Sequence, residues 1–280
     1  MNAQTPIVAD RPIDVQAAPP QPRSYSGGIN WIGVRTLYVR EVRRFWKVGM
    51  QTVAAPVVTT LLYMLVFVAA MNGARPAGGV SFAAFVGPGL IMMAILNNAF
   101  ANASSSLIQA KIMGTAADFL TPPLSPLELA AGFTLGAATR GIFVGLVTAV
   151  AVWPFSRYGF SQFWAVLYFG FGASMVMALV GVVTGLWAEK FDHLATVTNF
   201  VIMPLTFLSG TFSRVERFPE PFRTLSHYNP VFYLIDGFRY GFLGHADGDV
   251  AIGVVSTAAL TLALGFTCWL IFARGWRLKT

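Results

Sequence analysis

The chain has 280 residues, of which 55% are hydrophobic and only 11% are charged, whereas about a quarter of the residues in a soluble domain are charged. This composition argues against a soluble globular enzyme and indicates a membrane protein. The net charge is +7, but the charges lie between long stretches that contain none. The single cysteine, Cys268, has no second thiol with which to form an internal disulfide or a paired-thiol zinc site.

The first 28 residues are rich in proline and lack the apolar core of a signal peptide, so we predict a disordered cytoplasmic tail. Residues 29–48 then place apolar side chains on one side of a helix and basic ones on the other, which predicts an amphipathic elbow helix in the membrane surface. Glu41 falls on the apolar side, where Arg44 can pair with it. The helix could be a lipid-headgroup anchor or a contact for a cytoplasmic partner. Its candidate residues are Arg40, Glu41, Arg43, Arg44 and Lys47.

Charge-free stretches mark the membrane spans, because crossing a hydrocarbon core of about 30 Å takes about 20 helical residues. Arg140 falls within the third span, and because a central arginine is costly we place it toward one edge of the membrane. The fold class is therefore an all-α polytopic membrane protein with six spans, at about residues 50–73, 83–107, 130–153, 162–187, 194–212 and 250–273.

Basic residues fall mostly in the first flank, in the even-numbered connections and after the last span. Cytoplasmic flanks are enriched in lysine and arginine, so we predict that both termini are cytoplasmic. The long segment between residues 213 and 249 is then outside the cell.

A polar stripe runs along one face of the second span. It comprises Asn98, Asn102 and Ser105 and continues to Gln109. Such groups need hydrogen-bond partners in lipid. The stripe could bond to neighbouring helices within the bundle, or it could line a translocation path or a subunit seam.

The connection after the second span contains Asp118 before a short apolar turn and then three prolines. Ser125 and Glu128 have the spacing of a capping box, with Pro126 at the first helical position. We therefore expect a short cytoplasmic helix to end near Leu120 and the third span to start at Ser125. Lys111, Asp118, Phe119, Leu120 and Glu128 are the candidate residues for contact with a partner, although a plain connector is the alternative.

The sequence lacks the residue patterns of the common catalytic, cofactor-binding and metal sites. None of the four lysines lies in a phosphate-binding loop, and the three histidines have no neighbouring cysteine or paired carboxylates, so we expect no catalytic, cofactor-binding or metal site. The predicted spans contain no aspartate, glutamate or histidine, which argues against an ion-coupled carrier. Energy for transport would then come from a partner chain. The positive charge is local to the cytoplasmic flanks and gives no reason to expect nucleic acid.

Three stretches resemble the membrane permease of type-2 ABC exporters, a family that includes drug, nodulation-factor and polysaccharide exporters. They are the segment from Asp118 to Glu128 with Gly132, Arg140 and Gly141, the segment from Pro204 to Phe212, and the segment from Leu225 to Gly244. Together with the span layout, the resemblance covers about residues 30–275. The third stretch is the most specific, and in the family it forms outer re-entrant helices; its candidate residues are Asn229, Pro230, Asp236, Gly237 and Arg239.

The resemblance implies a permease of the bacterial inner membrane that moves a lipid, a glycan or a hydrophobic drug outward. It implies a homodimer that binds two copies of a separate ATPase, in which ATP and magnesium are held. A membrane anchor that recruits an ATPase without transport is the main alternative. Physical reasoning adds that residues 228–244 are too short and too charged to span yet too apolar for an open loop, so they should rest at the membrane interface, with Asp236 and Arg239 neutralising each other.

Overall fold

The computed structural model describes residues 28–70 and 81–275, apart from the side chains of Ala117 and Leu120. Regular structure within these ranges is entirely helical, which confirms the predicted all-α class. Six helices are long and apolar enough to cross a membrane. The predicted disordered tail lies almost wholly outside the described residues.

The number of candidate spans agrees with the six that were predicted. The spans are α2 (Gly49–Ala70), α3 (Phe82–Ile112), α5 (Pro126–Ser156), α6 (Phe163–Trp187), the combined helix Phe191–Leu208 and α11 (Val250–Arg274). Both α3 and α5 have 31 residues and are therefore about 46 Å long, more than the roughly 30 Å of a hydrocarbon core. Each can cross the membrane and also extend beyond it.

The fifth span is irregular and ends earlier than predicted, at Leu208. It consists of α7 (Phe191–Val197), a π-helical turn (η1, Thr198–Ile202) and α8 (Met203–Leu208). The N–H of Met203 bonds to the carbonyl of Thr198, five residues back. Pro204 has no N–H to donate, so an α-helical bond is lost at this point.

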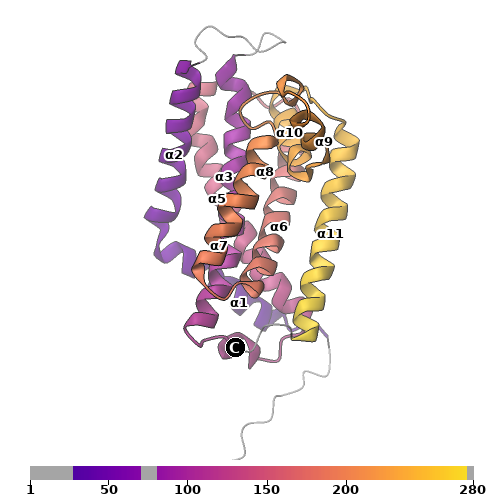
Figure 1. The fold of residues 1–280 in the computed structure, drawn as a ribbon. Coiled ribbons are helices and arrows are strands. Elements are labelled where there is room, and N and C mark those ends of the chain that lie inside the picture. The colour runs from indigo at the N-terminus through magenta and orange to yellow at the C-terminus, as the bar shows by residue number, and fades with distance from the viewer. Residues whose placement is uncertain (1–27, 71–80, 276–280) are drawn as a thin grey trace, which may run out of the picture.

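Helix α3 forms the centre of the bundle, packed between α5 and α6 (Figure 1). In the most apolar 18-residue stretch of α3, 89% of the residues are buried. In the corresponding stretches of α2 and α11, 11% are buried. The outer faces of α2 and α11 are therefore available to lipid or to another subunit.

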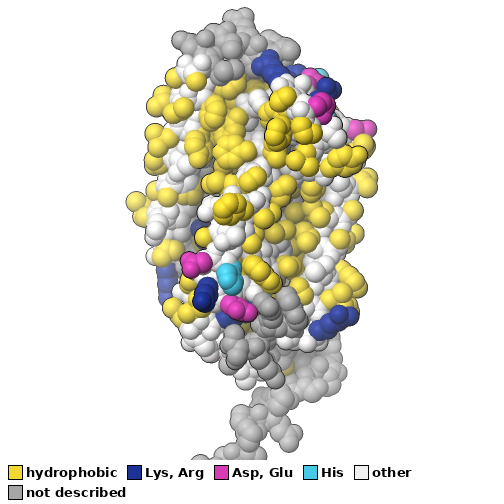
Figure 2. Space-filling model, in the orientation of Figure 1, with side chains coloured by type: hydrophobic (Ala, Val, Ile, Leu, Met, Phe, Trp, Pro, Cys, Tyr) yellow, Lys and Arg dark blue, Asp and Glu magenta, His cyan; other side chains and the backbone are white. Residues whose placement is uncertain are grey.

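The two ends of the bundle differ. At one end lie α1 (Trp31–Lys47), α4 (Ala117–Leu120) and the last turn of α11; at the other lie α9 (Phe222–Tyr228) and α10 (Pro230–Leu243), preceded by a short 3₁₀ turn at Val215–Arg217. Both ends of the described chain lie at the α1 end, as an even number of crossings requires. Figure 2 shows basic and acidic side chains near the two ends and a mainly hydrophobic band between them.

Candidate functional site

Helix α1 packs closely on α5. Its buried residues are Leu37, Glu41 and Phe45, spaced four apart on one face. A Cβ atom placed on Gly132 would lie 2.5 Å from Leu37 Cδ2, and one placed on Gly136 would lie 2.5 Å from Glu41 Cβ. These two glycines therefore let α1 approach α5 more closely than any larger residue would allow.

Glu41 is 1% exposed and has two partners. Its Oε2 atom lies 3.2 Å from Nε of Arg44, which confirms the predicted ion pair. Its Oε1 atom accepts a hydrogen bond of 2.8 Å from the Ser106 hydroxyl on α3. A buried carboxylate is costly unless it is paired and hydrogen-bonded, so these contacts explain how Glu41 is tolerated.

Arg44 turns inward although the helical pattern places it with the basic face. One of its Nη atoms donates to Asn102, at 2.7 Å to the backbone oxygen and 2.9 Å to Oδ1. Its other Nη atom donates to the Ser105 hydroxyl at 3.4 Å. Arg44 thus joins α1 directly to α3.

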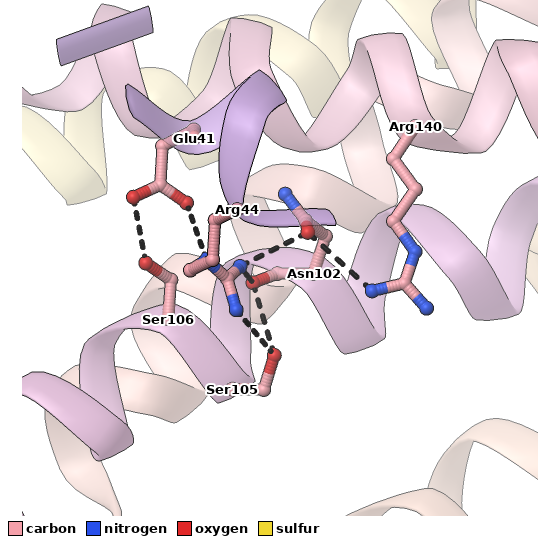
Figure 3. A network of polar contacts seen from close by, with 6 residues as sticks. All are labelled: Glu41, Arg44, Asn102, Ser105, Ser106 and Arg140. Atoms are coloured by element: carbon pink, nitrogen blue, oxygen red, sulfur yellow. Dashed lines mark hydrogen bonds and ion pairs between the residues drawn. The ribbon is translucent and has the colours of Figure 1, made fainter. Parts of the chain in front are cut away.

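Arg140 of α5 reaches the same point from another helix. Its two Nη atoms donate to Oδ1 of Asn102 at 3.4 Å and to Oδ1 of Asn98 at 3.3 Å. We call this set of seven residues from three helices the polar cluster: Glu41, Arg44, Asn98, Asn102, Ser105, Ser106 and Arg140 (Figure 3, which draws all but Asn98).

The polar stripe of the second span therefore makes hydrogen bonds within the bundle. Asn98, Asn102 and Ser105 all contact α1 or α5. Ser106 was missed by sequence reasoning, and the signal that could have found it is Glu41, whose apolar position required a second partner. A role for the stripe in a translocation path or subunit seam stays a prediction.

Glu128 holds the starts of two helices together. Its carboxylate accepts hydrogen bonds from the backbone N–H groups of Ser125 and Asn30, and the Ser125 hydroxyl accepts from the N–H of Glu128. The predicted capping box and the start of the third span are thus confirmed. Since Asn30 caps α1, the start of α1 is attached to the start of α5.

The other candidate contact residues lie around α4, which ends at Leu120 as predicted. Asp118 is exposed, whereas Phe119 is buried with its ring 5.2 Å from that of Phe133. Lys111 donates to the carbonyls of Leu186 and Ala188, which joins the ends of α3 and α6. The remaining elbow residues Arg43 and Lys47 are exposed, and Arg40 lies over the Phe119 ring.

Asn229 anchors α10 at the opposite end. Its Oδ1 accepts from the N–H of Val231, and Pro230 occupies the first helical position. Its amide donates to the Leu205 carbonyl and to the Ser209 hydroxyl, each at 2.8 Å. One side chain therefore caps α10 and attaches it to the end of the fifth span.

Asp236 and Arg239 form the predicted pair, with 4.0 Å between Oδ1 and Nη1. Asp236 also accepts from the N–H groups of Asp247 and Gly248. Burial raises the pKa of Asp236, and these donors and Arg239 act in the opposite direction. Arg239 is 2% exposed; it donates to the Gly210 carbonyl at 2.6 Å and lies 4.1 Å from the Phe85 ring centroid.

The apolar side chains of α10 face the bundle. Helix α10 packs against α3, α6 and α11, and its Gly237 lies so close to the Phe169 ring that a Cβ would not fit. The buried residues of α10 include the charged Asp236 and Arg239 as well as apolar ones, so protein covers most of the helix. A re-entrant position in the membrane stays a prediction.

Comparison with known proteins identifies the family. The model of the ABC-2 type transporter family matches residues 33–243. The chain belongs to the ABC-2 type transporter family.

Curated relatives of this ABC-2 type permease agree with the match. The chain is 34% identical over 257 residues to the inner membrane transport permease YadH of Escherichia coli K12, covering 89% of this chain and 98% of YadH. It is 27% identical over 234 residues to nodulation protein J of Rhizobium leguminosarum bv. trifolii, covering 80% of this chain and 85% of the relative. Permeases of this family generally pair with an ATPase subunit. The family role is that of a transport permease. In the part of the chain that the structure describes, no three His, Cys, Asp or Glu side chains are grouped so that they could hold a metal ion.

Proposed function

We propose that this chain is the membrane subunit of an ATP-driven exporter in the bacterial inner membrane, with both termini in the cytoplasm. Two copies would form the permease and two copies of a separate ATPase would bind ATP and magnesium. The cargo would be a lipid, a glycan or a hydrophobic drug. Membership of the family and the similarity to YadH support this proposal.

The observation that carries the proposal is the attachment of α1 to the central helix. The polar cluster joins α1 to α3 and α5, and Glu128 joins the start of α1 to the start of α5. A force applied to α1 would therefore reach the centre of the bundle through hydrogen-bonded side chains rather than through lipid.

The surface on which an ATPase could act lies at the same end. The exposed residues here are Asp118 of α4, Leu127 of α5 and, between the two helices, Thr121, Pro122 and Pro123. Exposed apolar and acidic groups beside one another suit a protein partner. Arg40 lies over Phe119, so α1 and the α4 segment would move together.

The exposed apolar faces of the bundle suit a second permease copy. Leu62 and Leu65 of α2 and Phe200 of the fifth span are exposed although they lie in the apolar band. Lipid can cover such residues, and two spans with so little burial also fit a subunit contact. We propose that the second copy is identical to the first, so that the permease is a homodimer.

The test exchanges the charge on the proposed docking surface. We expect Asp118→Lys to leave the amount of permease in the membrane unchanged and to uncouple ATP turnover from export when the ATPase is co-expressed. Glu216→Lys, an equal charge reversal at an exposed site at the opposite end of the molecule, is the matched control and should have no effect. Equal transport by Asp118→Lys and wild type would contradict the assigned surface. Failure of the chain to retain any ATPase under mild solubilisation would contradict the exporter itself.

A further inference from the structure

Arg140 carries a positive charge that the described protein does not balance. Among residues 28–70 and 81–275, no carboxylate lies within the 4.0 Å ion-pair limit of its guanidinium group. Its contacts are two long hydrogen bonds to neutral amides, and its Nε atom is buried without a partner in the described residues. A charge without a counter-ion inside a candidate membrane span has a high free-energy cost, so we expect a counter-ion to bind there.

The neighbouring groups do not supply that counter-ion. The polar cluster contains two arginines and one carboxylate, and Glu41 is already shared between Arg44 and Ser106. Helix α2, which packs on both α3 and α5, has no charged residue. The Nδ2 atom of Asn102 is also buried without a described partner. The cluster therefore has an excess positive charge.

An apolar groove lies on the same face of α5. Phe143 and Val147 follow Arg140 at helical spacings of three and seven, and both line a groove of about 730 Å³ between α5 and the corner where α1 meets α2. Val53, Ala54 and Val57 form its other wall. Lys47 and Gln51 add polar groups to the lining. A volume of this size falls within the usual range of about 300–1,000 Å³ for ligand sites.

We propose that Arg140 binds the anionic headgroup of an amphipathic molecule whose apolar part lies in this groove. The headgroup is an oxyanion, phosphate or carboxylate, because the planar guanidinium group matches its acceptor oxygens. This inference rests on the proposed function in one respect, which is that the bound molecule is cargo taken up at the end of the bundle where α1 lies. It narrows the cargo to amphipathic anions.

Binding is measured on the full chain, purified in nonionic detergent and without ATP or ATPase. The probes are phosphatidic acid, phosphatidylcholine with the same acyl chains, and inorganic phosphate, with bound lipid counted by native mass spectrometry. We expect wild type to prefer phosphatidic acid over phosphatidylcholine by about tenfold or more, and Arg140→Gln to lose most of that preference. Arg43→Gln removes an exposed charge from α1 and should keep the preference. Equal loss in both variants, or retention in Arg140→Gln, would overturn the site.

Thermal unfolding measurements distinguish the loss of a binding site from a folding defect in Arg140→Gln. In phosphatidylcholine alone, Arg140→Gln should unfold at the same temperature as wild type or higher, because an unbalanced charge has been removed. A large fall would show that the protein itself balances Arg140 and would overturn the proposal. Inorganic phosphate should not displace phosphatidic acid, since the groove contributes to binding; displacement would overturn the amphipathic part.

A final arm tests whether the bound anion is cargo. With the ATPase present, phosphatidic acid should raise the ATPase rate of wild type and Arg43→Gln but not of Arg140→Gln. Binding without stimulation would overturn the assignment as cargo while leaving the site in place. A failure of binding would leave the exporter function standing, because the binding measurement involves neither ATP nor transport.

Discussion

Arg44 of α1 donates hydrogen bonds from one Nη atom to both oxygens of Asn102 on α3, at 2.7 Å to the backbone carbonyl and 2.9 Å to Oδ1. Arg140 donates to the same Oδ1 from α5. Asn102 is fully buried, so one amide side chain joins three helices in the interior of the bundle.

Asn102→Leu should therefore loosen α1. The substitution leaves both arginines without their shared acceptor, and we expect it to lower the free energy of unfolding by about 1–3 kcal/mol. Asn97→Leu is the matched control: it lies in the same helix, outside the polar cluster, and its Oδ1 is buried without a partner in the described residues. We expect this control to be neutral or stabilising. Thermal unfolding in detergent compares the two variants. An equal loss of stability in both would show that the hydrogen bonds of Asn102 do not stabilise the bundle.

Gly136→Ala should separate α1 from α5. The added Cβ would lie 2.5 Å from Glu41 Cβ, and overpacking of this kind costs about 1–3 kcal/mol. Gly265→Ala adds the same methyl group in α11, where nothing lies within 4 Å, and should stabilise the helix by up to about 1 kcal/mol. Opposite changes in unfolding temperature are expected. Tolerance of alanine at Gly136 would mean that α1 does not sit tightly on α5.

Asn229 should stabilise the bundle through its contacts with Leu205 and Ser209 as well as by capping α10. Asn229→Ala removes both the cap and the attachment to Leu205, and should cost about 1–2 kcal/mol. Asn229→Asp keeps an acceptor for the cap but loses the amide that donates to Leu205 and Ser209. We expect the aspartate variant to be destabilised as well. An unchanged unfolding temperature in Asn229→Asp would show that Asn229 stabilises this end of the bundle through capping alone.

Both ends of the described chain lie at the α1 end of the bundle, so the orientation can be tested with one fusion. A reporter enzyme that is active only outside the cytoplasm, placed after the last residue, should show no activity. The same reporter inserted after Glu216, in the segment predicted to be outside, should be active. The reverse pattern would contradict the predicted orientation.

Much of the fold could be predicted from the sequence because charge-free length decides where a chain can cross a membrane. Gly49–Ala70 and Val250–Arg274 agree with the prediction for this reason, and the Ser125 cap was readable because capping depends on local spacing. The irregular middle of the fifth span was not predicted, because a π-helical turn has no clear composition signal.

The contacts between helices that are distant in the sequence were harder to predict than the spans. The sequence pattern predicted the Glu41–Arg44 pair, which is local, but not the bonds from Arg44 to Asn102, which join residues 58 apart. The burial of α10 was missed for the same kind of reason: whether an apolar helix faces lipid or protein depends on its neighbours, and periodicity alone does not reveal them.

ATP turnover in proteoliposomes tests the central claim most directly. The full chain is reconstituted with its ATPase, and the rate is measured with a lipid, a glycan and a hydrophobic drug as probes, beside an ATPase variant that lacks its phosphate-loop lysine. The account predicts that turnover depends on the permease, rises with one class of probe and falls in Asn102→Leu more than in Asn97→Leu. Turnover that is indifferent to the permease and to every probe would contradict it.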